Sequence, residues 1–158
     1  MKKIIKLIVL SIFCVMLVAC VSNKNDTSAT IQDQQEETKV EIQLDEENML
    51  IETMYGNIKY PYAFSDLIRV NRVENKGSVK ITFSVTTDDF SAEIYEVSFG
   101  EGTGMKLGAI NGTHVFVNIV ELQQNITENE KNIFYAAQET VNDVIASIMQ
   151  WENFTETK

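Results

Sequence analysis

Residues 105–121 read MKLGAINGTHVFVNIVE, and this stretch decides the class of fold. Its centre, Asn111-Gly112, favours the tight turn of a β-hairpin, because such a turn needs a positive φ at both positions. After the turn, apolar residues recur at every second position, which is the period of a strand with one buried face. The stretch therefore predicts two antiparallel strands, Met105–Ile110 and His114–Glu121.

Further β-like runs precede this hairpin, and turn-forming residues divide them. The runs are Met49–Tyr55, Ile58–Tyr60, Leu67–Val73, Ser78–Thr86 and Ala92–Phe99. Gly56-Asn57 and Asn75-Lys76-Gly77 predict the turns of two more hairpins. Since consecutive hairpins place each strand beside the next, we expect an antiparallel β-meander of about six strands.

The C-terminal part has the signature of a helix. Thr127-Glu128-Asn129-Glu130 fits a capping box, in which the side chains of the first and last residue each accept from the other's backbone N–H. Apolar residues then recur at steps of three and four: Ile133, Phe134, Ala137, Val141, Val144, Ile145, Ile148 and Trp151. This stripe predicts one long C-terminal helix that covers one face of the sheet or, as the alternative, forms a seam with a partner. The expected fold class is α+β, an antiparallel β-meander packed by this helix.

Residues 1–20 read MKKIIKLIVLSIFCVMLVAC and are typical of a secretion signal. Lysines precede the apolar run Leu7–Ala19, which is too short for a membrane span of about 20 residues. The run ends in Leu17-Val18-Ala19-Cys20, which resembles the lipobox of bacterial lipoproteins. This resemblance implies cleavage before Cys20 and a thioether between its sulfur and diacylglycerol, whose two acyl chains hold stably in a membrane.

The chain divides by composition into three parts. These are a signal peptide (1–19), a lipidated Cys20 with an acidic flexible tether (20–47) and a small α+β domain (48–158). The tether is rich in carboxylates and short polar residues, which do not bury a core, although alternating Val40, Ile42 and Leu44 leave open a short edge strand. We therefore expect the protein at the cell membrane, anchored through lipid and facing outside the cytoplasm.

The composition excludes several classes of partner. The 158-residue chain carries a formal net charge of −10, which argues against nucleic acid, because basic residues supply that attraction. One histidine and two cysteines are too few for a zinc cluster or a disulfide framework. We expect no metal and no cofactor.

Aromatic residues gather around Pro61 and are the candidate partner-binding residues: Tyr55, Tyr60, Tyr62 and Phe64. Such rings offer a large contact area at low entropic cost. The alternative is that they plug the open end of the sheet. The segment Ile51–Pro61, IETMYGNIKYP, resembles small uncharacterised lipoproteins of Gram-positive bacteria, a resemblance that implies no activity.

No catalytic constellation is recognisable in the sequence. The glycine-rich stretch Phe99–Lys106 lacks the strand-to-helix context of a phosphate-binding loop and is expected to be a flexible hairpin loop, and His114 has no nucleophile motif to serve. The leading hypothesis is a non-enzymatic lipoprotein that binds a protein or a small ligand. The alternatives are an assembly protein with the helix stripe as its interface, and a cell-envelope glycan hydrolase with a carboxylate pair. The hydrolase would draw its pair from Asp66, Asp88, Asp89, Glu93, Glu96 and Glu101.

Overall fold

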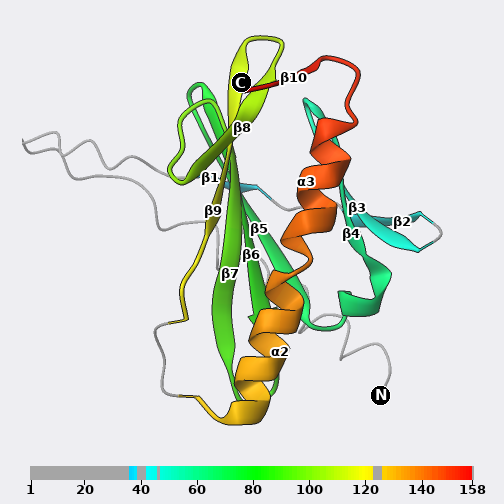
Figure 1. Ribbon diagram of the computed structural model, residues 1–158, viewed down its shortest axis with the longest axis vertical. Helices are drawn as coiled ribbons and strands as arrows, with labels where there is room; N and C mark the ends of the chain where they lie inside the picture. The colour runs from blue at the N-terminus through cyan, green and yellow to red at the C-terminus, as the bar shows by residue number, and fades with distance from the viewer. Residues whose placement is uncertain (1–35, 39–41, 46, 123–125, 158) are drawn as a thin grey trace, which may run out of the picture. The chain divides into compact units, whose positions relative to one another are not determined.

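The computed structural model describes residues 36–38, 42–45, 47–122 and 126–157, which form two antiparallel sheets and two α-helices (Figure 1). The predicted α+β class is confirmed. The predicted signal peptide and Cys20 lie outside the described residues. The domain extends further toward the N-terminus than residue 48, because β1 (Glu36–Thr38) and β2 (Ile42–Asp45) both pair with later strands.

The larger sheet has seven strands in the order β1-β5-β6-β7-β9-β8-β10, and each neighbouring pair is antiparallel. Its strands after β1 are β5 (Ile68–Asn75), β6 (Ser78–Thr86), β7 (Ser91–Phe99), β8 (Met105–Ile110), β9 (Thr113–Ile119) and β10 (Phe154–Glu156). The predicted turn between β8 and β9 is confirmed, since Asn111 and Gly112 have φ of 50° and 85°.

The order of the last strands differs from that of a strict meander. β9 pairs with β7, and β8 lies outside β9. The loop 100–104 carries the chain past the position next to β7 before β8 begins, and the tight turn then returns β9 into that position. Hydrophobic alternation assigns residues to strands and faces but does not specify which strand becomes the neighbour.

The smaller sheet contains β2, β3 (Asn48–Thr53) and β4 (Gly56–Pro61) in that order. Its second hairpin turn lies at Met54-Tyr55 and not at the predicted Gly56-Asn57, because Thr53 pairs with Gly56. The Thr53 hydroxyl closes this turn: it accepts from the backbone N–H of Tyr55 and of Gly56, both at 3.1 Å, and donates to the Gly56 carbonyl at 2.6 Å. A threonine side chain thus replaces the positive-φ residues that the prediction assumed.

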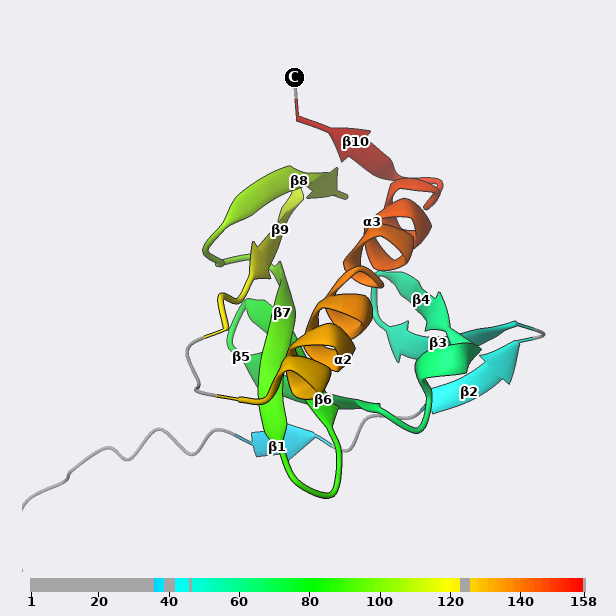
Figure 2. The same ribbon diagram turned by 60° about the horizontal axis from the view of Figure 1, so that its bottom comes forward.

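The predicted C-terminal helical segment forms as α2 (Glu128–Gln138) and α3 (Val141–Met149). The capping box at its start is confirmed, because the Thr127 side chain accepts from the Glu130 N–H and the Glu130 carboxylate accepts from the Thr127 N–H. Both helices turn their apolar stripe toward the sheets: α2 packs on β6 and β7, and α3 packs on β4 and β10 (Figure 2). The stripe therefore covers the sheet, which was the first of the two predicted uses.

A polar contact holds the join between the two helices inside the core. The Tyr95 hydroxyl lies 2.9 Å from the Thr140 Oγ1, which donates to the Ala137 carbonyl at 2.6 Å. The Gln138 Nε2 donates to two sheet carbonyls, those of Ile94 at 2.9 Å and Val120 at 2.8 Å. Burial raises the pKa of the Tyr95 phenol well above its usual range, so it stays a neutral hydrogen-bonding group.

One β-bulge decides which side chains of β7 reach the outer face of the larger sheet. In the strand register, Phe83 on β6 pairs with Tyr95, but the next residue, Ser84, pairs with Glu93. Ile94 therefore has no partner on β6 and is an extra residue on β7. Residues three apart on a regular strand point to opposite faces. The bulge instead turns Glu93 and Glu96 to the same face, the one away from the helices.

Candidate functional site

The four aromatic residues predicted to bind a partner do not form one surface. Tyr60 is only 1% exposed and packs edge-on against Phe83, with ring centroids 6.0 Å apart, so it cannot touch a partner; burial raises its pKa. Tyr55 stacks on Phe99 at 4.7 Å, and Phe64 is partly buried against the core. Tyr62 alone of the four is largely exposed, at 51%. Tyr55, Tyr60 and Phe64 thus pack within the domain, and Tyr62 points outward.

A polar groove crosses the outer face of β5, β6 and β7. We call it the carboxylate groove; it measures about 420 Å³. It is lined by Asn71, Val73, Asn75, Ser78, Lys80, Thr82, Glu93, Glu96 and Glu101. Three of the six carboxylates named for a glycan hydrolase thus meet in one hollow, whereas Asp66, Asp88 and Asp89 do not line it.

The groove carboxylates have different surroundings. The Glu96 oxygens are engaged by the Lys80 Nζ at 2.8 Å and by the Ser98 hydroxyl, which donates at 2.9 Å. Glu93 reaches the groove through the bulge at Ile94. Glu101 reaches it from the loop that follows β7. The groove therefore offers one ion-paired carboxylate and, beside it, carboxylates contributed by the bulge and by the loop.

The glycine-rich loop 100–104 is packed onto the sheet, which corrects the expectation of a flexible loop. A Cβ on Gly102 would come within 2.8 Å of the Ser98 Cβ and 2.9 Å of a Phe116 ring carbon, so the loop backbone lies directly on β7 and β9. The Gly100 N–H also donates to the His114 carbonyl at 2.8 Å. A strand follows the loop, so no helix N-terminus is present to receive a phosphate.

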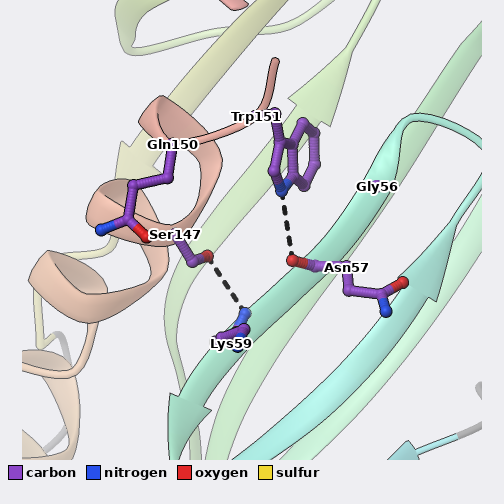
Figure 3. Close-up of a pocket in the computed structure, with 6 residues that line it drawn as sticks. All are labelled: Gly56, Asn57, Lys59, Ser147, Gln150 and Trp151. Carbon is purple, nitrogen blue, oxygen red and sulfur yellow. Dashed lines mark hydrogen bonds between the residues drawn. The ribbon is translucent and has the colours of Figure 1, made fainter.

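A second hollow lies between the edge of β4 and α3, and Figure 3 shows it in close-up. We call it the Trp151 pocket; it measures about 440 Å³. It is lined by Gly56, Asn57, Lys59, Ser147, Gln150 and Trp151. Two side chains from the C-terminal segment bind the backbone of β4 here: the Trp151 Nε1 donates to the Asn57 carbonyl at 3.2 Å, and the Ser147 hydroxyl accepts from the Lys59 N–H at 3.0 Å.

The indole of Trp151 lies directly over Gly56. A Cβ at Gly56 would be 2.7 Å from the Trp151 Cε2, closer than a real Cβ can approach, and the φ of this glycine is +151°. The indole is also nearly parallel to the Phe99 ring, at 15° and 5.9 Å between centroids. Glycine is therefore required at position 56 by the close approach of a side chain from the other end of the domain.

Three further candidates for function in the described part of the chain are His114, a metal site and a membrane-spanning helix. His114 lies at the sheet surface, with its Nε2 3.5 Å from the Lys106 Nζ and its ring edge-on to Phe116. Among the described residues, no three His, Cys, Asp or Glu side chains gather as they would around a metal ion. None of the helices in the described ranges combines the length and the apolar character of a membrane span.

The residues that line the two hollows are far apart in the sequence, and the sequence alone does not predict that they form sites. Trp151 was predicted as the end of a helical stripe and Gly56 as a turn residue, and nothing local shows that they meet. The bulge at Ile94 leaves the apolar alternation of β7 almost intact, so the shared face of Glu93 and Glu96 was also missed. Comparison of the chain with protein-family models, with curated proteins and with solved structures finds no match.

Proposed function

We propose that this chain is a lipid-anchored protein that faces outside the cytoplasm and whose small domain binds a ligand or a partner protein close to the membrane. The observation that carries the proposal is Leu17-Val18-Ala19-Cys20 behind a basic and apolar segment. The fully extended chain between Cys20 and Glu36 spans at most about 58 Å, at up to roughly 3.6 Å per residue. A domain that begins at Glu36 would therefore remain near the bilayer.

Labelled palmitate tests the anchor. Cells that express the chain should incorporate the label into it, and the substitution Cys20→Ser should abolish incorporation. Cys14→Ser is the matched control, because Cys14 lies in the segment that processing would remove. Label retained on the Cys20→Ser chain would contradict the anchor.

Binding to a partner is tested by cross-linking at the cell surface. Tyr62 is the exposed member of the aromatic set, so Tyr62→Ala should reduce capture without affecting folding, whereas a change at Tyr60 would disturb the core. Lys76→Ala, in the exposed turn between β5 and β6, is the control. Equal capture by wild type and by Tyr62→Ala would remove Tyr62 from the binding surface.

A glycan hydrolase is the second candidate, and the carboxylate groove favours it. Glu93, Glu96 and Glu101 line one groove. Inverting glycosidases use two carboxyl groups that flank the scissile bond, one as general acid and one as general base. In this candidate Glu93 and Glu101 are the groups available to move a proton, because Lys80 and Ser98 engage Glu96.

Release of reducing ends from purified cell-wall glycan tests the hydrolase. The full chain should release them, and Glu93→Gln should abolish release, while Asp66→Asn, outside the groove, should leave it unchanged. Absence of release by the wild-type chain would remove this candidate. The structure does not favour the third candidate, an assembly protein that uses the helix stripe as its interface. Phe134, Val144 and Ile148 of that stripe are fully buried within the domain.

A further inference from the structure

The larger sheet has an edge that is only partly covered. β5 pairs with β6 along its whole length, from Ile68 to Asn75, but its other side pairs with β1 through only three residues, Arg72–Glu74. Within the described ranges, no strand pairs with residues 68–71 on that side. An edge strand presents backbone N–H and C=O groups to which another chain can pair, so β5 offers a place for an added strand.

The other sheet edges in the described ranges are shorter or occupied. β10 and β2 have three and four residues. The edge of β4 is bound by the Trp151 side chain at Asn57 and by the Ser147 side chain at Lys59. β5 is therefore the edge on which an incoming strand would form the longest ladder.

The carboxylate groove lies beside this edge, on the outer face of the sheet. Asn71, Val73 and Asn75 of β5 line it together with three glutamates and one lysine. Directly opposite residues of paired strands share a face, so residues of an added strand opposite Asn71 and Val73 would lie on the groove face. Alternate side chains give the specificity in this mode of recognition. The surplus of carboxylates favours lysine or arginine at those two positions.

The two arginines of β5 do not oppose a basic strand at these positions. Arg72 lies on the other face of β5, where Glu74 pairs with it and the Glu52 carbonyl accepts from its Nη1 at 3.1 Å. Arg69 lies beyond Asn71, and its Nη1 donates to the Ile68 carbonyl at 3.2 Å. The groove carboxylates therefore dominate the charge beside Asn71 and Val73.

β1 is a weak occupant of this edge. It pairs through three residues, and its register sets Glu37 opposite Val73, beside the groove carboxylates. Like charges at neighbouring positions weaken the pairing of strands. A longer strand that carries the opposite charge can therefore displace β1.

We infer that the outer edge of β5 binds an extended segment of a partner protein, which carries lysine or arginine at alternate positions and replaces β1. The inference rests on the proposed binding function and gives that function a surface and a partner chemistry. A second copy of this chain is not the favoured occupant. It also carries a formal net charge of −10, and pairing two β5 edges would bring two carboxylate grooves toward each other.

Two fluorescein-labelled peptides test the edge, with the full chain as the cell produces it. The basic probe is Thr-Lys-Thr-Lys-Val-Thr-Ile. In the register of β1 its lysines lie opposite Val73 and Asn71, and its valine and isoleucine lie opposite Val70 and Ile68. The acidic probe has glutamate in place of both lysines. Fluorescence anisotropy should show saturable binding of the basic probe, with a dissociation constant below about 1 mM, and at least tenfold weaker binding of the acidic probe.

A variant of β1 tests the displacement. Glu37→Lys should weaken binding of the basic probe at least threefold, because it gives β1 the charge that the groove attracts. Glu156→Lys makes the same change of charge on β10, at the opposite edge of the sheet, and is the matched control. Amide hydrogen exchange locates the probe, since the amides of Ile68–Asn71 should become more protected when it binds.

Four results would overturn the inference. These are no binding of the basic probe up to about 1 mM, equal binding of the two probes, unchanged affinity in Glu37→Lys, and new protection on β2 or β10 in place of β5. Protection of β5 in the free chain through self-association would assign the edge to a second copy instead. A chain that incorporates palmitate and is cross-linked to a partner, but binds neither probe, refutes only the β5 site and leaves the proposed function standing.

Discussion

Tyr60 and Tyr62 are two residues apart and have opposite environments, and the reason is local. Along β4 the side chains alternate, so that Ile58 and Tyr60 enter the core while Asn57 and Lys59 stay exposed. Pro61 ends the strand, and the short 3-10 helix η2 (Tyr62–Phe64) turns the next ring outward. A cluster of aromatic residues in a sequence therefore does not define a surface, because here the end of β4 at Pro61 and the turn of η2 separate Tyr60 from Tyr62.

The capping box at Thr127 gives the domain a dependence on pH. The Thr127 hydroxyl and N–H donate to the Glu130 carboxylate at 2.7 and 2.6 Å, and these bonds hold the pKa of Glu130 below its ordinary value of 4.5. A carboxyl whose pKa is lowered by folding stabilises the folded state above its unfolded pKa, and this contribution is lost as the pH falls through the lowered value.

Thermal unfolding of wild type and Glu130→Gln checks this dependence. At pH 7 the wild-type chain should have the higher Tm, since glutamine accepts the same bonds without a charge. The difference should shrink as the pH falls below 4.5 and through the lowered pKa of Glu130, because protonation removes the charge of the carboxylate. A difference of the same size at pH 7 and pH 3 would contradict the role of the ionised carboxylate.

At the scale of elements, side chains from the helices satisfy backbone groups that the sheets leave open. Gln138 at the end of α2 binds carbonyls beside the bulge of β7 and after β9, while Ser147 and Trp151 bind the edge of β4. The helices thus do more than cover an apolar face. They also bind the bulge of β7 and the edge of β4, and one of the two hollows lies beside each of these places.

Replacing Gln138 by leucine should lower the free energy of unfolding by about 1–3 kcal/mol, because the Ile94 and Val120 carbonyls lose a donor. Urea denaturation followed by circular dichroism measures the change. Glu139→Ala, at the neighbouring exposed position, is the matched control and should change stability by no more than about 0.5 kcal/mol. Equal effects of the two substitutions would mean that the amide does not hold the bulge.

The contact between Gly56 and Trp151 predicts a coupled pair. Gly56→Ala should destabilise the wild-type domain by about 1–3 kcal/mol, since the new Cβ would overlap the indole. In a Trp151→Ala background the same change should cost clearly less, and the double-mutant cycle measures that coupling. Additive effects of the two substitutions would show that the glycine is required for its backbone conformation alone.

At the scale of the whole molecule, the sequence predicts what depends on neighbouring residues. The Asn111-Gly112 turn, the capping box at Thr127 and the helical stripe each arise from contacts within a few residues, and all three are found. The turn at Met54-Tyr55 was mispredicted because Gly56 serves a contact with Trp151, 95 positions away. The position of β9 between β7 and β8 was also not predicted, and neither were the two hollows. Both depend on contacts between residues that are far apart in the sequence.

We propose that a lipid on Cys20 holds this domain at the membrane, and the mass of the protein extracted from membranes is the decisive measurement. We expect a chain that begins at Cys20 and carries the added mass of a diacylglyceryl group on that residue. A chain that still begins at Met1, or one in which Cys20 is a free thiol, would contradict it.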